Sequence, residues 1–172
     1  MRREAAKGTR PLGEPSVPDM TAKAIQILQK SPNGFFLYVH TNRVDYHHHR
    51  NEAKKALLGA LELEEAVIEA VKRTNERDTL IIVTSPFSQM MKIAGFSDRG
   101  NDILASLNFK QPSASPLSRS THGADDVGIY AQGPMSHLFH TVHEQHYIAH
   151  VMAYAACVGP YKSTARCNRK KH

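Results

Sequence analysis

Two short apolar runs constrain the fold of this chain more than any other feature of its sequence. Phe35–Val39 and Leu80–Val83 are both of strand length, and neither contains a charged residue. Uninterrupted runs of this kind are typical of strands that are buried on both faces of a sheet. Helical periodicity lies before the first run and between the two, so helices and strands alternate along the chain. This alternation predicts an α/β fold with a mostly parallel sheet flanked by helices.

The helical segments are bounded by clear signals. A helix is predicted from Asp19, and the turn-forming residues 31–34 end it. The strongest helical pattern covers Glu52–Arg73, where an apolar stripe is formed by Leu57, Leu61, Ile68 and Val71. The other predicted segments are a mostly irregular stretch (84–120), a third strand (Val127–Tyr130) and a final helix (142–158).

Length and composition favour one globular domain. The chain has 172 residues, of which 41% are hydrophobic, and this is enough for one sizeable core. We expect a disordered basic lead-in over 1–18, a structured portion over 19–160 and a basic tail over 161–172. No apolar run approaches the roughly 18 residues of a membrane span, so no transmembrane segment is expected.

The basic charge is concentrated near the two ends. Lys and Arg number 22 against 16 Asp and Glu, which gives a net charge of +6. Basic residues near the ends are Arg2, Arg3, Lys7, Arg10, Lys162, Arg166, Arg169, Lys170 and Lys171. No aromatic residues are interleaved with them, as a surface that stacks bases would require. We therefore expect solvated tails and no nucleic-acid partner.

The cysteines and the termini do not assign a compartment. Cys157 and Cys167 are close enough to close a short loop in an oxidising environment, and two free thiols agree equally well with the composition. Residues 1–17 lack the apolar stretch of a secretory signal. The chain ends on a basic stretch without the apolar tail of a lipid-anchor signal.

Histidine is unusually frequent, with 11 residues, and its densest cluster follows the first apolar run. Asp45 and His49 are four residues apart, so on a helix they share one face. His122 lies far along the chain, just before the third predicted strand. Two histidines and one carboxylate are a familiar zinc set that leaves a coordination position open. Taken alone, the adjacent histidines 47–49 agree equally well with a surface tract, and His122 with a loop residue.

Several motifs resemble those of the animal alkaline phosphatases and follow in the same order. The resemblance extends from about Gly13 to Tyr161 and corresponds to the C-terminal portion of that family. The matching segments are Asn33–Val39, Asp78–Thr84, Gly95–Asn101, Thr121–Val127, Gly133–Gln145 and His150–Cys157. The resemblance implies a partial alkaline-phosphatase-like fold, phosphate monoesters as substrates, and zinc and magnesium as cofactors.

The resemblance also implies which metal sites are retained. Asp45, His49 and His122 occupy the positions of all three protein ligands of the first catalytic zinc. The second zinc is held in the family by an Asp-His pair, and this chain has Pro86 and Phe87 there, neither of which ligates a metal. We therefore expect one zinc site and the loss of the second.

The magnesium site and the nucleophile are altered too. The magnesium-binding Glu of the family is replaced by His40, although magnesium prefers oxygen ligands. The family nucleophile is the Ser of an Asp-Ser-Ala turn, and no Asp-Ser pair occurs in the sequence. The stretch between Asn101 and Ser120 is shorter than the family region that helps to join the dimer. Because both metals and the Ser contribute to the reaction, we expect a truncated, catalytically impaired chain and assign no catalytic residue.

Four hypotheses follow from the sequence. The chain is an inactive phosphatase homologue, a non-catalytic zinc-binding protein, a partner in a homodimer or in a heterodimer with a full-length relative, or a fragment without function. Zinc content, hydrolysis of a phosphate ester and co-purification discriminate among them.

Overall fold

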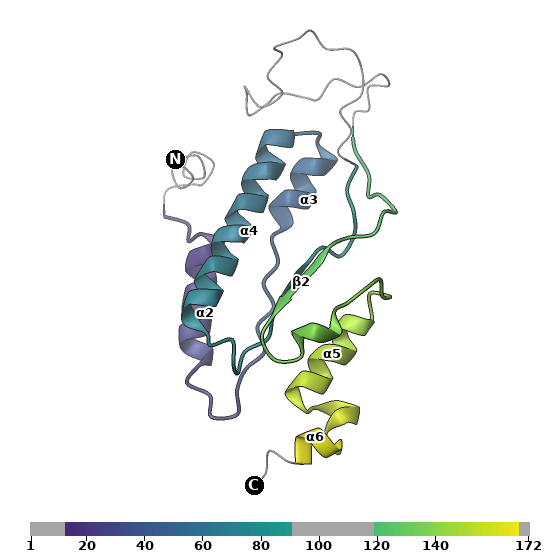
Figure 1. Cartoon of the computed structure of the whole chain (residues 1–172). Coiled ribbons are helices and arrows are strands. Elements are labelled where there is room, and N and C mark those ends of the chain that lie inside the picture. The colour runs from purple at the N-terminus through teal and green to yellow at the C-terminus, as the bar shows by residue number, and fades with distance from the viewer. Residues whose placement is uncertain (1–12, 91–118, 169–172) are drawn as a thin grey trace. The chain divides into compact units, whose positions relative to one another are not determined.

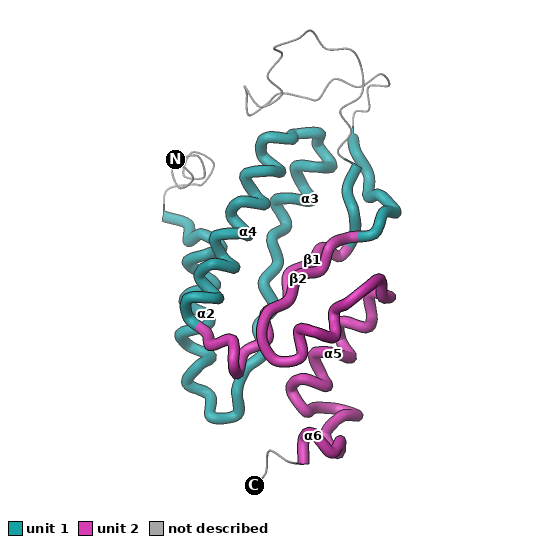
Figure 2. Tube along the Cα trace, in the orientation of Figure 1, with its two compact units in different colours: residues 1–73, 87–126 teal, residues 74–86, 127–172 magenta. Residues whose placement is uncertain are grey.

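The computed structural model describes residues 13–90 and 119–168, which belong to two compact units (Figure 1; Figure 2). Unit 1 is formed by residues 1–73 and 87–126, and unit 2 by residues 74–86 and 127–172. Each unit therefore combines segments that are distant in sequence. The chain length alone had favoured a single domain. None of the helices in the described ranges has the length and apolar character that crossing a membrane requires.

The helices of unit 1 within the described residues are α2 (Val17–Leu28), α3 (Asn42–His49) and α4 (Ala53–Arg73). Both α2 and α3 pack against α4 (Figure 1). A capping box sets the start of α2, because the Ser16 side chain accepts a hydrogen bond from the Asp19 amide at 3.1 Å and Asp19 bonds back to Ser16. The helix thus begins at Val17, two residues before the predicted start and inside the segment predicted as a lead-in.

The buried face of α4 is made of small residues. Ala56, Gly59 and Ala66 are buried, whereas the leucine and β-branched residues of the predicted apolar stripe are partly exposed. A Cβ added to Gly59 would lie 3.1 Å from Cγ2 of Val44. The predicted helix is confirmed, but its stripe is not the packing face, because small side chains allow α3 to approach more closely.

Unit 2 contains a two-stranded sheet and a helical C-terminal segment. Strands β1 (Ile81–Thr84) and β2 (Ile129–Gln132) pair antiparallel, with Ile82 opposite Ala131. The other elements are η1 (Ser136–Leu138), α5 (Tyr147–Ala156), η2 (Gly159–Tyr161) and α6 (Ala165–Asn168). Cys157 and Cys167 form a disulfide, which resolves the alternative left open by the composition.

The mixed helix and strand content agrees with the predicted class, but the predicted parallel sheet is not confirmed. The sheet within the described ranges has two strands, and they are antiparallel. Phe35–Val39 forms no strand: the side chains of Phe36 and Tyr38 are 70% and 72% exposed. Apolar content alone does not make a strand, because the backbone needs a neighbouring strand with which to bond.

The remaining predicted segments are shifted or shortened. The third strand begins at Ile129 rather than Val127, and the final helix is limited to Tyr147–Ala156. The segment 161–172, predicted as a tail, contains the end of η2 and the short helix α6. Most of the irregular stretch 84–120 lies outside the described residues.

Candidate metal centre

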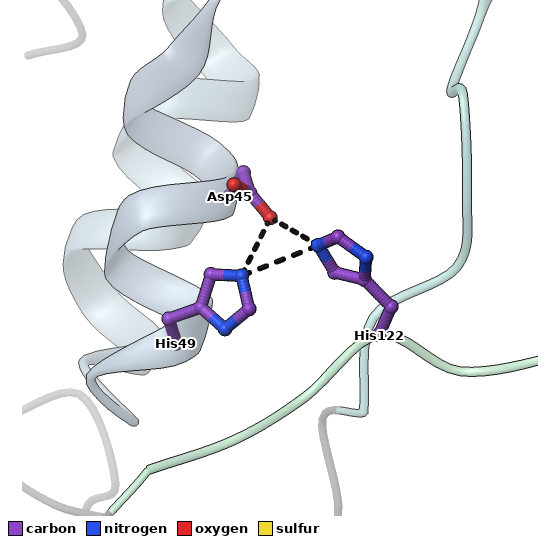
Figure 3. Close-up of side chains that lie close together, drawn as sticks. All are labelled: Asp45, His49 and His122. Carbon is purple, nitrogen blue, oxygen red and sulfur yellow. Dashed lines mark hydrogen bonds and ion pairs between the residues drawn. The ribbon is translucent and has the colours of Figure 1, made fainter.

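Helix α3 presents two of the predicted ligands. Its first turn contains Asp45, whose carboxylate is favoured near the positive end of the helix dipole. His49 ends the helix four residues later, so both side chains lie on one face. Figure 3 shows these two side chains pointing toward His122, which comes from a separate extended segment. The conditional prediction of a shared helical face is therefore confirmed.

His122 is held in place by a second segment of unit 1. Residues 88–90 run beside 120–123, and Gln89 and His122 form an antiparallel bridge. The Gly123 amide donates to the carbonyl of Ser88 at 2.8 Å, and the Ser120 hydroxyl donates to the carbonyl of Met90 at 2.8 Å. A Cβ on Gly123 would lie 2.5 Å from Oγ of Ser88. Glycine at position 123 therefore leaves room for the Ser88 side chain where the two segments approach each other beside His122.

The three side chains bring one ligand atom each to a common point. Oδ1 of Asp45 lies 3.3 Å from Nε2 of His49 and 3.1 Å from Nε2 of His122, and the two nitrogens are 3.2 Å apart (Figure 3). Tetrahedral zinc with bonds of about 2.0–2.1 Å places neighbouring ligand atoms about 3.3–3.4 Å apart. The donor set and its spacing therefore fit a zinc ion.

The surroundings of His49 prepare its Nε2 to be a ligand. Its Nδ1 lies 2.8 Å from the carbonyl oxygen of Ser120, which accepts hydrogen bonds but cannot donate one. The proton of a neutral His49 ring is therefore placed on Nδ1, leaving the Nε2 lone pair directed at the cluster. The Ser120 amide in turn donates to the carbonyl of His49 at 3.0 Å, so the two segments fix each other.

Two further side chains, from the segment after β1, contact the cluster of Asp45, His49 and His122. The ring of Phe87 stacks on His122, with centroids 3.6 Å apart and planes 17° apart. Nε2 of Gln89 donates a hydrogen bond to Oδ1 of Asp45, the same oxygen that faces both histidines. The sequence predicted only that Phe87 replaces a ligand of the family's second zinc, and it predicted no contact for Gln89. Glutamine is an uncommon metal ligand, so its position in the sequence gave no signal.

The other histidines of the tract have separate roles. His47 Nδ1 lies 2.7 Å from Oε2 of Glu52, and the other carboxylate oxygen, Oε1, accepts a hydrogen bond from Lys55 at 3.0 Å. Burial by itself would raise the pKa of Glu52, but these hydrogen bonds and the nearby charge of Arg50 hold that pKa below its ordinary value. Burial lowers the pKa of His48, although Asp45 opposes this effect. The tract 47–49 is half-buried, so it is not a free surface tract.

A cavity of about 530 Å³ adjoins the cluster on the side of α3. It reaches Asp45 and His49 and is otherwise lined by Asn42, Tyr46, Arg50, Glu52 and Arg119. Its wall combines two arginines, whose guanidinium groups can bind anions, with the carboxylates of Asp45 and Glu52. His40, which stands at the family's magnesium position, is exposed beside Tyr38 and does not belong to the cluster or to the cavity lining.

The fold and the cluster describe a mixed helix-and-strand protein whose two histidines and one carboxylate suit a divalent metal. The sequence matches the family profile described as alkaline phosphatase over residues 3–110 and 104–158. The chain therefore belongs to the alkaline phosphatase family. Zinc and magnesium dependence is a general property of that family.

Individual relatives agree with this assignment. The chain is 38% identical to tissue-nonspecific alkaline phosphatase of Gallus gallus over an alignment of 190 positions, gaps included, which covers 87% of this chain and 37% of that protein. It is 38% identical to the Homo sapiens isozyme over 186 residues (85% and 36%). It is 36% identical to alkaline phosphatase of Gadus morhua over 186 residues (85% and 39%). The chain thus spans little more than a third of the length of these relatives.

Proposed function

We propose that this chain is a zinc-binding homologue of the alkaline phosphatases that retains one metal site and does not hydrolyse phosphate esters by itself. Asp45, His49 and His122 bind the ion. The observation that carries the proposal is the convergence of their three ligand atoms within 3.1–3.3 Å of one another. A bound zinc ion would supply Lewis acidity at this point.

The residues around the cluster support a single metal rather than two. At the family's second-zinc position the chain has Pro86 and Phe87, and the Phe87 ring stacks on His122 instead of ligating. His40 offers a nitrogen where magnesium prefers oxygen. The 172 residues contain no Asp-Ser pair that could serve as nucleophile. Loss of one such catalytic group typically costs about 100-fold or more in rate, so these losses together leave no measurable hydrolysis.

The substrate class of the family enters this proposal only as a ligand. Phosphate monoesters are dianions near neutral pH, and the cavity beside Asp45 and His49 contains Arg50 and Arg119. We therefore expect the chain to bind phosphate-like anions weakly, without turnover.

The sequence also predicts a mostly parallel sheet. Such a sheet would require Phe35–Val39 to pair with strands other than β1 and β2.

Zinc content and ester hydrolysis test the proposal. The wild-type chain should retain about one zinc per chain after removal of loosely bound metal, and His122→Ala should lose it. His48→Ala is the matched control, because it removes a histidine of the same tract that does not belong to the cluster. Equal zinc in wild type and His122→Ala would refute the site. Hydrolysis of a chromogenic phosphate ester at a rate typical of the family would refute the non-hydrolytic role.

A second candidate function is pairing with a full-length alkaline phosphatase. It is favoured by the extended segment Phe35–Val39, where Phe36 and Tyr38 expose large apolar surfaces. Contiguous exposed apolar patches mark interaction sites on proteins. Co-purification with a full-length relative that is lost in a Phe36→Ser, Tyr38→Ser double variant would support this role. A wild-type chain that stays monomeric in the presence of the relative would exclude it.

A further inference from the structure

We propose that Gln89 is a fourth protein ligand, through its amide oxygen, of the ion bound by Asp45, His49 and His122. The inference rests on the proposed function and deepens it. Zinc sites with four protein ligands are structural, whereas catalytic sites keep one position for water or substrate. With Gln89 as a ligand, the centre is closed and holds α3 to the segments 88–90 and 120–123.

The first evidence is the place of the Gln89 amide. Its nitrogen donates to Oδ1 of Asp45, the oxygen that lies 3.3 Å from Nε2 of His49 and 3.1 Å from Nε2 of His122. The antiparallel bridge places Gln89 opposite His122. The amide group therefore already lies beside the three ligand atoms, and no backbone segment has to move for it to join them.

The second observation concerns Oε1, the amide oxygen of Gln89. Oε1 of Gln89 is buried and accepts no hydrogen bond from the described part of the chain. Leaving a buried polar atom unsatisfied costs about 1–3 kcal/mol, and a bound ion is one explanation for such an atom. The terminal torsion of glutamine has a broad range of allowed angles. A rotation about that bond brings Oε1 toward the ligand atoms, where the ion becomes its partner.

The composition of the set and the shape of the cavity agree with a closed site. Two imidazole nitrogens, one carboxylate oxygen and one amide oxygen suit zinc and manganese. The cavity beside α3 reaches Asp45 and His49, but neither His122 nor Gln89 lines it. The side of the cluster on which Gln89 lies is therefore not part of that cavity. An exogenous anion in the cavity would have to displace a ligand to reach the ion.

Cobalt substitution tests whether the site is closed. The Co²⁺ forms of wild type, Gln89→Leu and Gln89→Glu are titrated with inorganic phosphate and with azide while the visible absorption is recorded. We expect the wild-type spectrum to stay unchanged, because no coordination position is open. Gln89→Leu should open one position, so its spectrum should shift with either anion. Its metal affinity, measured against a chelator, should fall about 10- to 100-fold, as for loss of a supporting metal partner.

The Glu variant and a second control keep the result interpretable. Gln89→Glu retains a ligand oxygen, so its spectrum should resist anions and its affinity should be at least that of wild type. Gln145→Leu removes another glutamine with a side-chain hydrogen bond, to the carbonyl of Pro86, and should change neither property. Anion-induced shifts of equal size in wild type and Gln89→Leu would overturn the proposal and leave Gln89 only a donor to Asp45. A wild-type chain that binds no metal would instead refute the proposed function itself.

Discussion

Two histidine-rich regions, one in each unit, differ in what surrounds their imidazole rings. In unit 1, His49 and His122 converge on the carboxylate of Asp45. In unit 2, the ring of His143 stacks on Tyr147 with centroids 4.1 Å apart, and Nδ1 of His150 lies 2.9 Å from the Tyr161 hydroxyl. Both regions have a pair four residues apart at a helix: Asp45 and His49 lie on α3, and His146, the N-cap of α5, precedes His150 on that helix.

The difference shows that helical spacing alone does not create a metal site. His150 contacts the ring of Tyr161 edge-on, and His146 contacts His150 edge-on at 6.0 Å between centroids. The pair on α3 includes a carboxylate and meets a third side chain from a distant segment. Within residues 13–90 and 119–168, the group Asp45, His49 and His122 is the one that brings three ligand atoms together.

The largest expected effect separates the two regions by metal affinity. Asp45→Ala should weaken zinc binding about 1,000-fold, or about 4 kcal/mol, because loss of a direct ligand exceeds the 10- to 100-fold effect of an outer partner. His150→Ala should change the affinity by less than about threefold. Competition with a chromophoric chelator measures both. Comparable losses in the two variants would mean that the α5 histidines also bind the ion.

Reduction of the Cys157–Cys167 disulfide should destabilise the helices of unit 2, just as removal of the metal should destabilise α3 in unit 1. The disulfide joins residues 10 positions apart, and closing a loop of that length stabilises a fold by about 3 kcal/mol in the chain-entropy account. A mild reductant should therefore increase hydrogen exchange in α5 and α6, and a chelator should increase it in α3. The expected patterns are independent. If reduction also weakened zinc binding, the units would be coupled rather than separate.

The sequence predicted that Asp45 and His49 share a helical face, because their four-residue spacing and the polar segment after an apolar run are local features. His122 required the family resemblance, since nothing local distinguishes it from a loop histidine. The contact of Gln89 with Asp45 was missed because it depends on a bridge between Gln89 and His122, which are far apart in sequence. The strand predicted over Phe35–Val39 failed for a related reason, since strand formation depends on a partner. The packing face of α4 was misassigned because close helix contact favours Gly59 over the larger leucines.

A smaller effect tests how rigidly the His122 segment is held. Gly123→Ala would place a Cβ 2.5 Å from Oγ of Ser88, which also accepts a hydrogen bond from the Asp125 amide at 3.1 Å. Overpacking of this kind costs about 1–3 kcal/mol. We expect weaker zinc binding and a lower melting temperature in the presence of zinc. Ser88→Gly in the same chain removes the clashing hydroxyl and should restore part of the affinity, and an unchanged affinity in Gly123→Ala would show that the loop adjusts freely.

The smallest effect concerns His47, which belongs to the same tract as His49 but bonds Glu52 instead of the cluster. Hydrogen bonds to a charged group contribute about 1.5–3 kcal/mol, and Gln at position 52 keeps part of them, so Glu52→Gln should cost about 1 kcal/mol at pH 7. The pKa of Glu52 is lowered in the folded chain by Lys55, His47 and Arg50. Its contribution is therefore complete above its ordinary value of 4.5 and is lost as the pH falls through the lower folded value.

Urea unfolding of the metal-free chains at pH 7 and at pH 3 measures this contribution. The difference between wild type and Glu52→Gln should shrink on acidification, while the zinc affinities of the two chains at pH 7 should agree within about threefold. If the difference in unfolding free energy between wild type and Glu52→Gln did not change with pH, the negative charge of Glu52 would contribute nothing to stability. A large loss of zinc affinity in Glu52→Gln would instead show that His47 and Glu52 orient α3 for metal binding, and the tract would then act as one unit with the cluster.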